Sequence, residues 1–427
     1  MYLKKIRLHN IRGFRDLDFD LSRDSGGNYA GWTVFTGNNG SGKSSLLKAI
    51  AIALTGKEVA RALQPSFKRW VYNGENEGFI EFDIDPIESD DYFSVSGRTS
   101  YAPFRTKLLF NAIYDNEPTL SIDKSAKKGI TAERGLWAPG ANGWFSCGYG
   151  PFRRVFGASP DAQRQMVAPS AERFVTMFLE DASLAEMDRW LRDLKYKELE
   201  KNDEAKHQLD TVIALLRDEF MPNELTIDHV DSDGLWLKDP HNLMLSWQEM
   251  SDGYRAALAL LGDILRHMMT VYGSANLIKK REGKFVVNKS GIVLVDEIDV
   301  HLHPEWQRMI GFWLKRHFPK IQFLVTSHSP IICQAADKKG IFHLPPPGSD
   351  NAPRPLDDEE YQKIITSTPN TILLSSAFGL QNSRSPLIVD KRAERSRLKA
   401  KQRVGALSAS ETADLSLLDT FINPDEE

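Results

Sequence analysis

Nine residues near the N-terminus have the types and spacing of a loop that binds phosphate. Gly37 and Gly42 are separated by four residues, and Lys43 and Ser44 follow directly. Glycines let successive backbone N–H groups turn toward a phosphate, a lysine reaches the β- and γ-phosphates, and a serine hydroxyl ligates Mg²⁺. The residues expected to contact phosphate are Gly37, Asn38, Asn39, Gly40, Ser41, Gly42, Lys43, Ser44 and Ser45.

A pair of carboxylates follows a short apolar run much later in the chain. The run 292–295 is typical of a strand that is buried on both faces of a parallel sheet, and Asp296 and Glu297 come immediately after it. Asp296 is expected to hold Mg²⁺, and Glu297 to orient and polarise an attacking water. Two surface acids at a strand end are the alternative interpretation, which the phosphate loop makes less attractive.

Two further features could contact the γ-phosphate. Ser251-Asp-Gly253 directly precedes an apolar helix, so a hydroxyl and free backbone N–H groups meet at a helix N-terminus. An ordinary turn and helix cap is the alternative there. His328 follows the apolar strand 321–327 and is expected to hydrogen-bond the γ-phosphate.

The elements that must position these residues follow from the pattern of the sequence. Strand 32–36 leads into the glycine loop and helix 45–54 leaves it, while a helix is expected over 304–317. A proline-rich linker follows about residue 343. The expected divisions are 1–170 with the phosphate loop, 171–222 as a helical insertion, 223–343 with the carboxylates and His328, and 344–427 as a linker and helical extension.

The composition is that of a soluble globular protein. The chain has 427 residues, 41% of them hydrophobic, and 54 Lys and Arg against 58 Asp and Glu give a net charge of -4. No overall positive field therefore draws it to nucleic acid, and any such contact needs a local patch. Two cysteines and the lack of a long apolar run predict a cytoplasmic protein with no membrane span.

Together, these motifs resemble the ABC-type ATPases of the SMC, RecF and OLD group. Residues 37–44 match its Walker A motif, 250–254 its signature and 292–297 its Walker B motif, with Asp299 in the D-loop and His328 as the switch histidine. The resemblance covers about residues 1–343. It implies an α/β P-loop ABC ATPase head with a mixed or parallel sheet, a short helical insertion and a helical C-terminal extension.

The resemblance also implies a mechanism and a set of ligands. Two heads would sandwich ATP and Mg²⁺, so that Ser251 and Gly253 of one copy face the nucleotide of the other. Homodimerisation, or a higher homo-oligomer, is then part of the site. The implied roles are catalytic for Glu297, His328 and Lys43, nucleotide-binding for Asp299, and metal-binding for Ser44 and Asp296; Gln163 or Gln165 would be the Q-loop glutamine, and Arg12 and Phe14 would contact adenine.

A narrower resemblance concerns compact ATPases of bacterial antiphage systems such as Septu and PARIS. Segments 148–153 and 372–379 are similar to segments of those ATPases. The region after His343 has no convincing Glu plus Asp-x-Asp arrangement of a Toprim nuclease. The resemblance therefore implies that the ATPase controls a separate effector, such as a nuclease.

Two other functions remain open from the sequence. The first is a RecF-like DNA-repair ATPase that binds DNA directly, with the basic run Lys391–Arg403 as a contact, although a solvated helix face is the favoured explanation of that run. The second is a scaffold that ATP locks into an oligomer with negligible turnover. Glu297 argues against the scaffold, because a scaffold needs no carboxylate to activate water.

Overall fold

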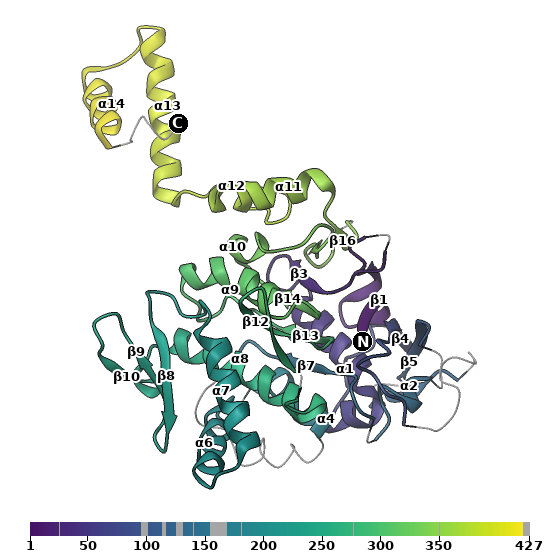
Figure 1. Ribbon diagram of the computed structural model, residues 1–427. Helices are drawn as coiled ribbons and strands as arrows, with labels where there is room; N and C mark the ends of the chain where they lie inside the picture. The colour runs from purple at the N-terminus through teal and green to yellow at the C-terminus, as the bar shows by residue number, and fades with distance from the viewer. Residues whose placement is uncertain are drawn as a thin grey trace. The chain divides into compact units, whose positions relative to one another are not determined.

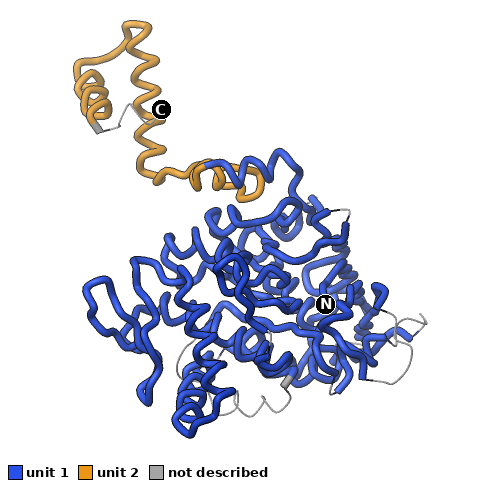
Figure 2. Tube along the Cα trace, viewed as in Figure 1, with its two compact units in different colours: residues 1–367 blue, residues 368–427 orange. Residues whose placement is uncertain are grey.

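The computed structural model describes residues 1–24, 26–94, 101–112, 117–124, 131–139, 141–153, 169–180, 182–275, 277–349 and 351–421 (Figure 1). The chain divides into two compact units, Met1–Ser367 and Thr368–Glu427, which Figure 2 distinguishes by colour. The larger unit contains every residue that the motifs above single out, apart from the C-terminal basic run and the 372–379 segment.

The glycine loop, the paired carboxylates and His328 each follow a strand of one mixed sheet of six strands (Figure 1). From edge to edge its strands are β16 (Arg354–Pro355), β15 (Ile341–His343), β3 (Gly31–Thr36), β14 (Ile321–Thr326), β13 (Gly291–Val295) and β7 (Ser146–Tyr149). All neighbours pair in parallel except β15 and β16. The strands β3, β14 and β13 are adjacent, so the segments after their carboxyl ends meet at one edge. The predicted α/β fold with a parallel sheet is confirmed.

Helices cover both faces of this sheet. The core that contains Phe35 also contains the buried face of α1 (Lys43–Leu63), whereas Trp32 lies against Gly311 of α9 (Pro304–His317). Because Trp32 and Phe35 are an odd number of positions apart on one strand, they point to opposite faces. Helices α1 and α9 therefore lie on opposite sides of β3, as in other doubly wound sheets.

A second, antiparallel sheet packs on the other side of α1. Its strands, in spatial order, are β2 (Phe14–Asp20), β1 (Tyr2–Ile11), β4 (Glu77–Asp85), β5 (Phe104–Asn111) and β6 (Thr119–Ile122). Apolar residues alternate with polar ones along these strands, as expected of a sheet with one buried face. Helix α1 is buried between the two sheets, which fixes the start of the helix and thus the loop before it.

Helix α8 (Asp252–Tyr272) begins after the third sheet of the larger unit. A three-stranded antiparallel sheet, in the order β10, β9, β8, leads through a short 3₁₀ helix into α8, which contacts α6 and β7. The other bounds are α2 (Thr131–Arg134), α4 (Pro169–Glu172), α5 (Val175–Phe178), α6 (Glu186–Leu199), α7 (Asp203–Arg217), β8 (Thr226–Asp231), β9 (Gly234–Lys238), β10 (Met244–Ser246), η1 (Trp247–Glu249), β11 (Ile278–Arg281), β12 (Lys284–Val287), α10 (Pro330–Cys333) and α11 (Asp358–Thr366).

The smaller unit consists of α12 (Pro369–Leu373), α13 (Pro386–Arg403) and α14 (Ala409–Phe421). Leu398, Leu415 and Leu418 form its buried cluster, and Arg395 Nε donates to Asp419 Oδ1 at 2.6 Å. The basic run predicted to be helical lies in α13. Among the described residues of either unit, we find no helix with the length and apolarity that a membrane crossing requires.

Candidate functional site

The glycine loop adopts backbone angles that require glycine. The φ angles of Gly37, Gly40 and Gly42 are +148°, +81° and +91°. Side chains there would also collide, since a Cβ on Gly37 would lie 2.2 Å from the Leu344 carbonyl oxygen and one on Gly42 would lie 2.6 Å from the Phe14 ring. The loop is thus held from both sides in the tight conformation that turns backbone N–H groups inward.

Lys43 and Ser41 supply polar groups that suit a phosphate. The Lys43 ammonium is buried and donates to the carbonyls of Gly37 at 2.9 Å and Asn38 at 3.0 Å, so it closes the loop on itself. Ser41 Oγ is buried, and the described part of the chain gives it no hydrogen-bond partner. A buried hydroxyl without a partner is costly unless a ligand satisfies it. The loop therefore fits an oxyanion.

The Thr326 hydroxyl joins the Asp296 carboxylate to the backbone of Glu297 at the end of β13. It donates to Asp296 Oδ1 at 2.5 Å and accepts the backbone N–H of Glu297 at 2.7 Å. Asp296 is 2% exposed, whereas the Glu297 side chain is only half-buried, and the Glu297 backbone has a φ of +46°. A positive φ at a non-glycine residue needs support from its surroundings, which the Thr326 bond provides.

The turn after Glu297 is tied to the end of β14 by a second hydroxyl. Ser327 Oγ donates to Asp299 Oδ1 at 2.6 Å and accepts the N–H of Ser329. Gln307 on α9 donates to the Leu302 carbonyl at 2.9 Å and accepts the Ser329 hydroxyl. Asp299 is thereby fixed next to the segment that carries His328.

The charged groups of the site are close enough to influence one another. Burial lowers the pKa of Lys43, while Asp296, Glu297 and Asp299 act in the opposite direction. Burial also lowers the pKa of His328, and the positive charge of Lys43 lowers it further. Lys43, His328 and the three carboxylates thus share one electrostatic environment, built from loops that are remote in the sequence.

The Ser251 turn is exposed and caps α8 without using its side chain. Ser251 has extended backbone angles, and its hydroxyl makes no capping hydrogen bond. Gly253 lies against the turn after Glu297, because a Cβ on Gly253 would lie 2.4 Å from the carbonyl oxygen of His301. The start of α8 is thus in direct contact with the carboxylate turn of the same chain.

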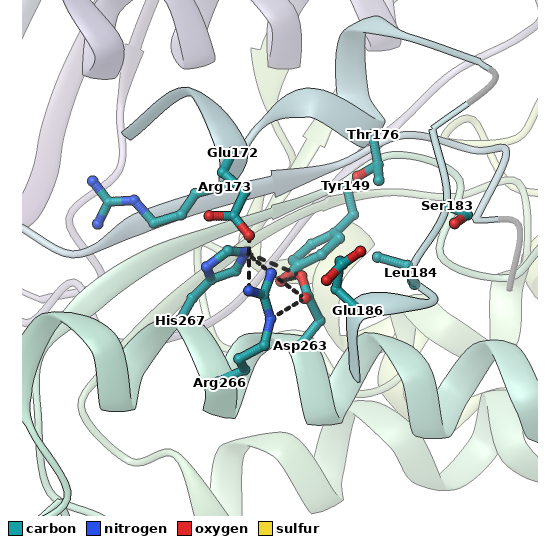
Figure 3. Close-up of a pocket in the computed structure, with 10 residues that line it drawn as sticks. All are labelled: Tyr149, Glu172, Arg173, Thr176, Ser183, Leu184, Glu186, Asp263, Arg266 and His267. Carbon is teal, nitrogen blue, oxygen red and sulfur yellow. Dashed lines mark hydrogen bonds and ion pairs between the residues drawn. The ribbon is translucent and has the colours of Figure 1, made fainter. Parts of the chain in front are cut away.

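A buried polar network holds α8 to β7 and α4 (Figure 3). Asp263 Oδ2 accepts the Tyr149 hydroxyl at 3.0 Å, and Asp263 Oδ1 accepts Arg266 Nη2 at 2.9 Å. Arg266 also donates to Glu172 Oε1 at 2.7 Å, and His267 Nε2 lies 3.2 Å from Asp263. Figure 3 shows these side chains turned toward one another, so two elements, β7 and α4, are fixed to the helix that Ser251 begins.

Asp263→Asn is expected to lower the free energy of unfolding at neutral pH by about 3 to 5 kcal/mol, because it removes the buried carboxylate that pairs with Arg266 and His267 and leaves Arg266 with Glu172 alone. Burial raises the pKa of the Asp263 carboxyl, but His267 and Arg266 outweigh burial and hold the pKa below its usual range. The carboxylate therefore stabilises the wild type above about pH 4, and this share is lost as the pH falls further. Urea unfolding at pH 7 and below pH 4 measures both effects.

Asp210→Asn is the control, because Asp210 is an exposed carboxylate on α7. Its unfolding free energy is expected to stay within about 0.5 kcal/mol of wild type. Equal effects of the two variants at pH 7 would contradict the ion-pair role of Asp263.

Thr326→Val is expected to lower the rate of nucleotide hydrolysis about 10-fold to 100-fold, as is usual when a group that orients a ligand residue is removed. Valine keeps the shape of Thr326 but leaves the Glu297 N–H and Asp296 Oδ1 without their shared hydroxyl. Phosphate release at saturating ATP measures the rate. Thr106→Val is the matched control, since Thr106 is equally buried in β5 and its hydroxyl has no partner among the described residues. Equal rates in both variants would contradict the prediction.

The remaining predicted residues have these positions. Phe14 packs on Gly42 of the glycine loop, and the Arg12 guanidinium lies 4.5 Å from the centre of the Trp70 ring. Gln163 and Gln165 lie outside the described residues. Sequence reasoning included Thr326 only within the expected strand 321–327 and missed its bridge between the Asp296 carboxylate and the Glu297 backbone, because that bridge depends on the pairing of β13 with β14.

A glycine loop between a parallel strand and a buried helix, with paired carboxylates at the end of a nearby strand, defines a P-loop ATPase head. The chain belongs to the family described as "AAA domain, putative AbiEii toxin, Type IV TA system", whose model matches residues 32–334. That range contains the glycine loop, the Ser251 turn, the carboxylates and His328.

The relatives of this chain include a Septu protein and a probable retron ATPase. The chain is 26% identical over 343 residues to "Septu protein PtuA" of Bacillus mycoides, covering 77% of this chain and 38% of that protein. It is 41% identical over 106 residues to "Retron Ec83 probable ATPase" of Escherichia coli, covering 25% of this chain and 18% of that protein. The matched parts are thus well under half of these relatives. A solved SMC head bound to the C-winged helix domain of ScpA has a TM-score of 0.46 at 15% identity, covering 83% and 98% of the two chains.

Proposed function

We propose that the protein is a Mg²⁺-dependent ATPase subunit of a bacterial antiphage system, which dimerises around ATP and controls a separate effector. The observation that carries the proposal is the meeting of Lys43, Asp296 and Glu297 at one edge of the parallel sheet, next to a loop shaped for an oxyanion. In-line attack of water on a γ-phosphate needs this combination of phosphate cradle, metal ligand and water-orienting carboxylate.

The phosphate cradle consists of the loop 37–42 and the first residues of α1. Lys43 exchanges its two carbonyl partners for the β- and γ-phosphates, and Ser41 gives its free hydroxyl to an oxygen of the same group. Ser44 and Asp296 would hold Mg²⁺, because a hydroxyl and a carboxylate supply the oxygen ligands that this ion prefers. When bound, Mg²⁺ neutralises charge on the phosphate oxygens.

The hydrolytic step uses Glu297 and His328. Glu297 accepts a hydrogen bond from the attacking water and orients it toward the γ-phosphate. Thr326 keeps the Glu297 backbone in its left-handed conformation, so the carboxylate keeps a fixed direction. His328 donates a hydrogen bond to the γ-phosphate from the end of β14.

Dimerisation completes the site. The Ser251 hydroxyl and the N–H groups at the start of α8 bind the γ-phosphate held by the Lys43 loop of a second copy. Exposure of Ser251 and the absence of a capping bond from its hydroxyl support this role. Gly253 and Asp299 line the same junction. ATP is then needed to close the pair, and hydrolysis releases it.

The relatives named above, a Septu protein and a probable retron ATPase, support the antiphage role, and the separate effector is part of the proposal. An effector such as a nuclease is the partner that this role requires. DNA repair with direct DNA binding is the competing function. It predicts DNA affinity that falls steeply with salt and is lost when Lys391, Arg392 and Arg395 are neutralised.

Purified protein tests the proposal by two measurements. We expect Mg²⁺-dependent release of phosphate from ATP, and an increase in molecular mass by light scattering when ATP is added. Lys43→Ala should remove both. A chain that neither binds nor hydrolyses ATP would contradict the proposal, and dimerisation that ignores ATP would contradict the composite site.

A further inference from the structure

Arg153 is a buried arginine beside the carboxylate turn, for which the mechanism above has no use. It follows β7, the strand that pairs in parallel with β13, and the N–H of Asp296 donates to the carbonyl of Tyr149 at 2.8 Å. The chain leaving β7 therefore runs directly beside the chain leaving β13. Arg153 is 4% exposed, and burial lowers the pKa of its guanidinium to about 10, so it is charged at neutral pH.

The Arg153 guanidinium donates to backbone carbonyls of the carboxylate turn. Nη1 donates to the carbonyls of Asp296 at 2.8 Å and Gly150 at 3.0 Å. Nη2 donates to Glu297 at 3.0 Å, Val300 at 3.2 Å and Ile298 at 3.4 Å. None of the ion pairs found among the described residues includes Arg153. Its N–H groups therefore stabilise the backbone conformation of residues 296–300 and do not pair with a carboxylate.

The Arg153 guanidinium supplies hydrogen-bond donors to buried carbonyl groups of the turn. Glu297 has a positive φ, and the carbonyls of residues 296, 297, 298 and 300 converge on one buried guanidinium, where oxygen atoms without a donor would repel one another. The planar guanidinium has five N–H donors in a fixed geometry, which lysine lacks. Arg153 thus determines where the Glu297 side chain leaves the backbone.

The same turn also supports the start of α8. His301 follows the segment that Arg153 holds, has a φ of +68°, and presents its carbonyl oxygen to Gly253. A shift of residues 296–300 would therefore move both Glu297 and the surface on which the Ser251 turn rests. Arg153 consequently affects both Glu297 in its own site and the Ser251 turn, which would bind the γ-phosphate held by a second copy.

We propose that Arg153 is a positioning residue for ATP hydrolysis, which fixes the 296–300 turn and thereby aligns Glu297 and the Ser251 turn. This inference rests on the proposed ATPase function. Arg153 should act on the hydrolytic step rather than on nucleotide binding, because its hydrogen bonds reach the carboxylate turn and not the glycine loop. Its loss should therefore lower kcat and leave nucleotide affinity largely intact.

Arg153→Met and Arg153→Lys, in the full chain, test the inference. We expect kcat for ATP to fall by about 10²-fold in Arg153→Met, the cost of a displacement of about 1 Å in a catalytic group. Arg153→Lys should recover part of the rate, since it keeps the charge and up to three donors. The dissociation constant of a fluorescent ATP analogue should change less than about threefold, in keeping with a loss confined to the transition state.

Arg23→Met is the matched control. Arg23 is also buried, and it donates to the carbonyls of Tyr29 and Trp32, but it lies at the opposite end of β3 from the glycine loop. We expect Arg23→Met to lower thermal stability with kcat of the folded protein unchanged. Amide hydrogen exchange gives a second measurement that needs no turnover: the N–H groups of Val300 and Leu302 should exchange faster in Arg153→Met and Arg153→Lys but not in Arg23→Met.

The outcomes separate this inference from the proposed function. If the wild type hydrolyses ATP, Glu297→Gln does not, and Arg153→Met turns over like the wild type, the positioning role is wrong and the ATPase stands. Unchanged exchange at Val300 and Leu302 in either Arg153 variant would also overturn it, even if the wild type showed no turnover. Equal losses of kcat in Arg153→Met and Arg23→Met would reduce Arg153 to a general support of the fold and overturn the inference.

Discussion

Glu297→Gln is expected to lower the rate of ATP hydrolysis by about 10² to 10⁴, the usual contribution of a general base. The amide keeps the size and the hydrogen-bonding reach of the carboxylate but cannot take a proton from water. Binding of ATP should survive, because the glycine loop, Lys43 and Ser44 are unchanged. Phosphate release at saturating ATP and equilibrium binding of a fluorescent ATP analogue measure the two quantities separately.

The ATP-bound dimer should also accumulate in Glu297→Gln, since closure needs ATP and opening needs its hydrolysis. Light scattering after addition of ATP measures this effect. Glu58→Gln is the control: Glu58 is an exposed carboxylate of α1 whose side chain is 82% accessible, and its replacement should change neither rate nor assembly. Hydrolysis by Glu297→Gln at the wild-type rate would refute the role of this carboxylate.

Mixing two inactive variants is expected to restore activity. Lys43→Ala removes the phosphate lysine, and Ser251→Glu places a negative charge where the γ-phosphate of a second copy should bind. Each variant alone should lose about 10²-fold or more in rate. In a mixed dimer, the Lys43 loop of one chain meets the Ser251 turn of the other, so one of the two sites is intact.

The size of the recovery follows from the symmetry of the dimer. Neither variant has an intact site with which to pair with itself, so the dimers that close around ATP are mixed and have one intact site of two, and the mixture should reach up to about half of the wild-type rate. Ser251→Glu is compatible with α8, because Ser251 makes no side-chain cap and a negative charge favours a helix N-terminus. A double variant with both changes, mixed with either single variant, should stay inactive. No recovery in the first mixture would mean that Ser251 does not act on a second copy.

Several parts of the fold were predictable because the pattern of a few residues admits one local structure. The glycine loop needs positive φ at defined positions, and the structure has them at Gly37, Gly40 and Gly42. Helix 304–317 has a proline in its first turn and basic residues in its last, and its observed bounds are the predicted ones. The expected helix 45–54 was too short, because α1 continues through a kink at Gly56 to Leu63.

The supporting contacts were not predictable from the sequence. Thr326 and Asp296 are remote in the chain, and their hydroxyl–carboxylate bond exists only because β13 and β14 are neighbours with ends in register. Arg153 reaches the same turn only because β7 pairs with β13. The polar network around Asp263 depends on how α8 packs against β7 and α4. Strand order and helix packing decide each of these contacts, and no local pattern encodes them.

The sequence by itself determined which residues can contact phosphate, metal and water, because their chemistry and spacing are local properties. It also determined the local conformation of the glycine loop, since only glycine tolerates those backbone angles. The tertiary structure decided which carboxylates meet Lys43, which hydroxyl orients Glu297, and that Gly253 rests on the turn after Glu297. Those outcomes depend on the order of strands in the sheet, which is set by burial of apolar surface over the whole chain rather than by any one segment.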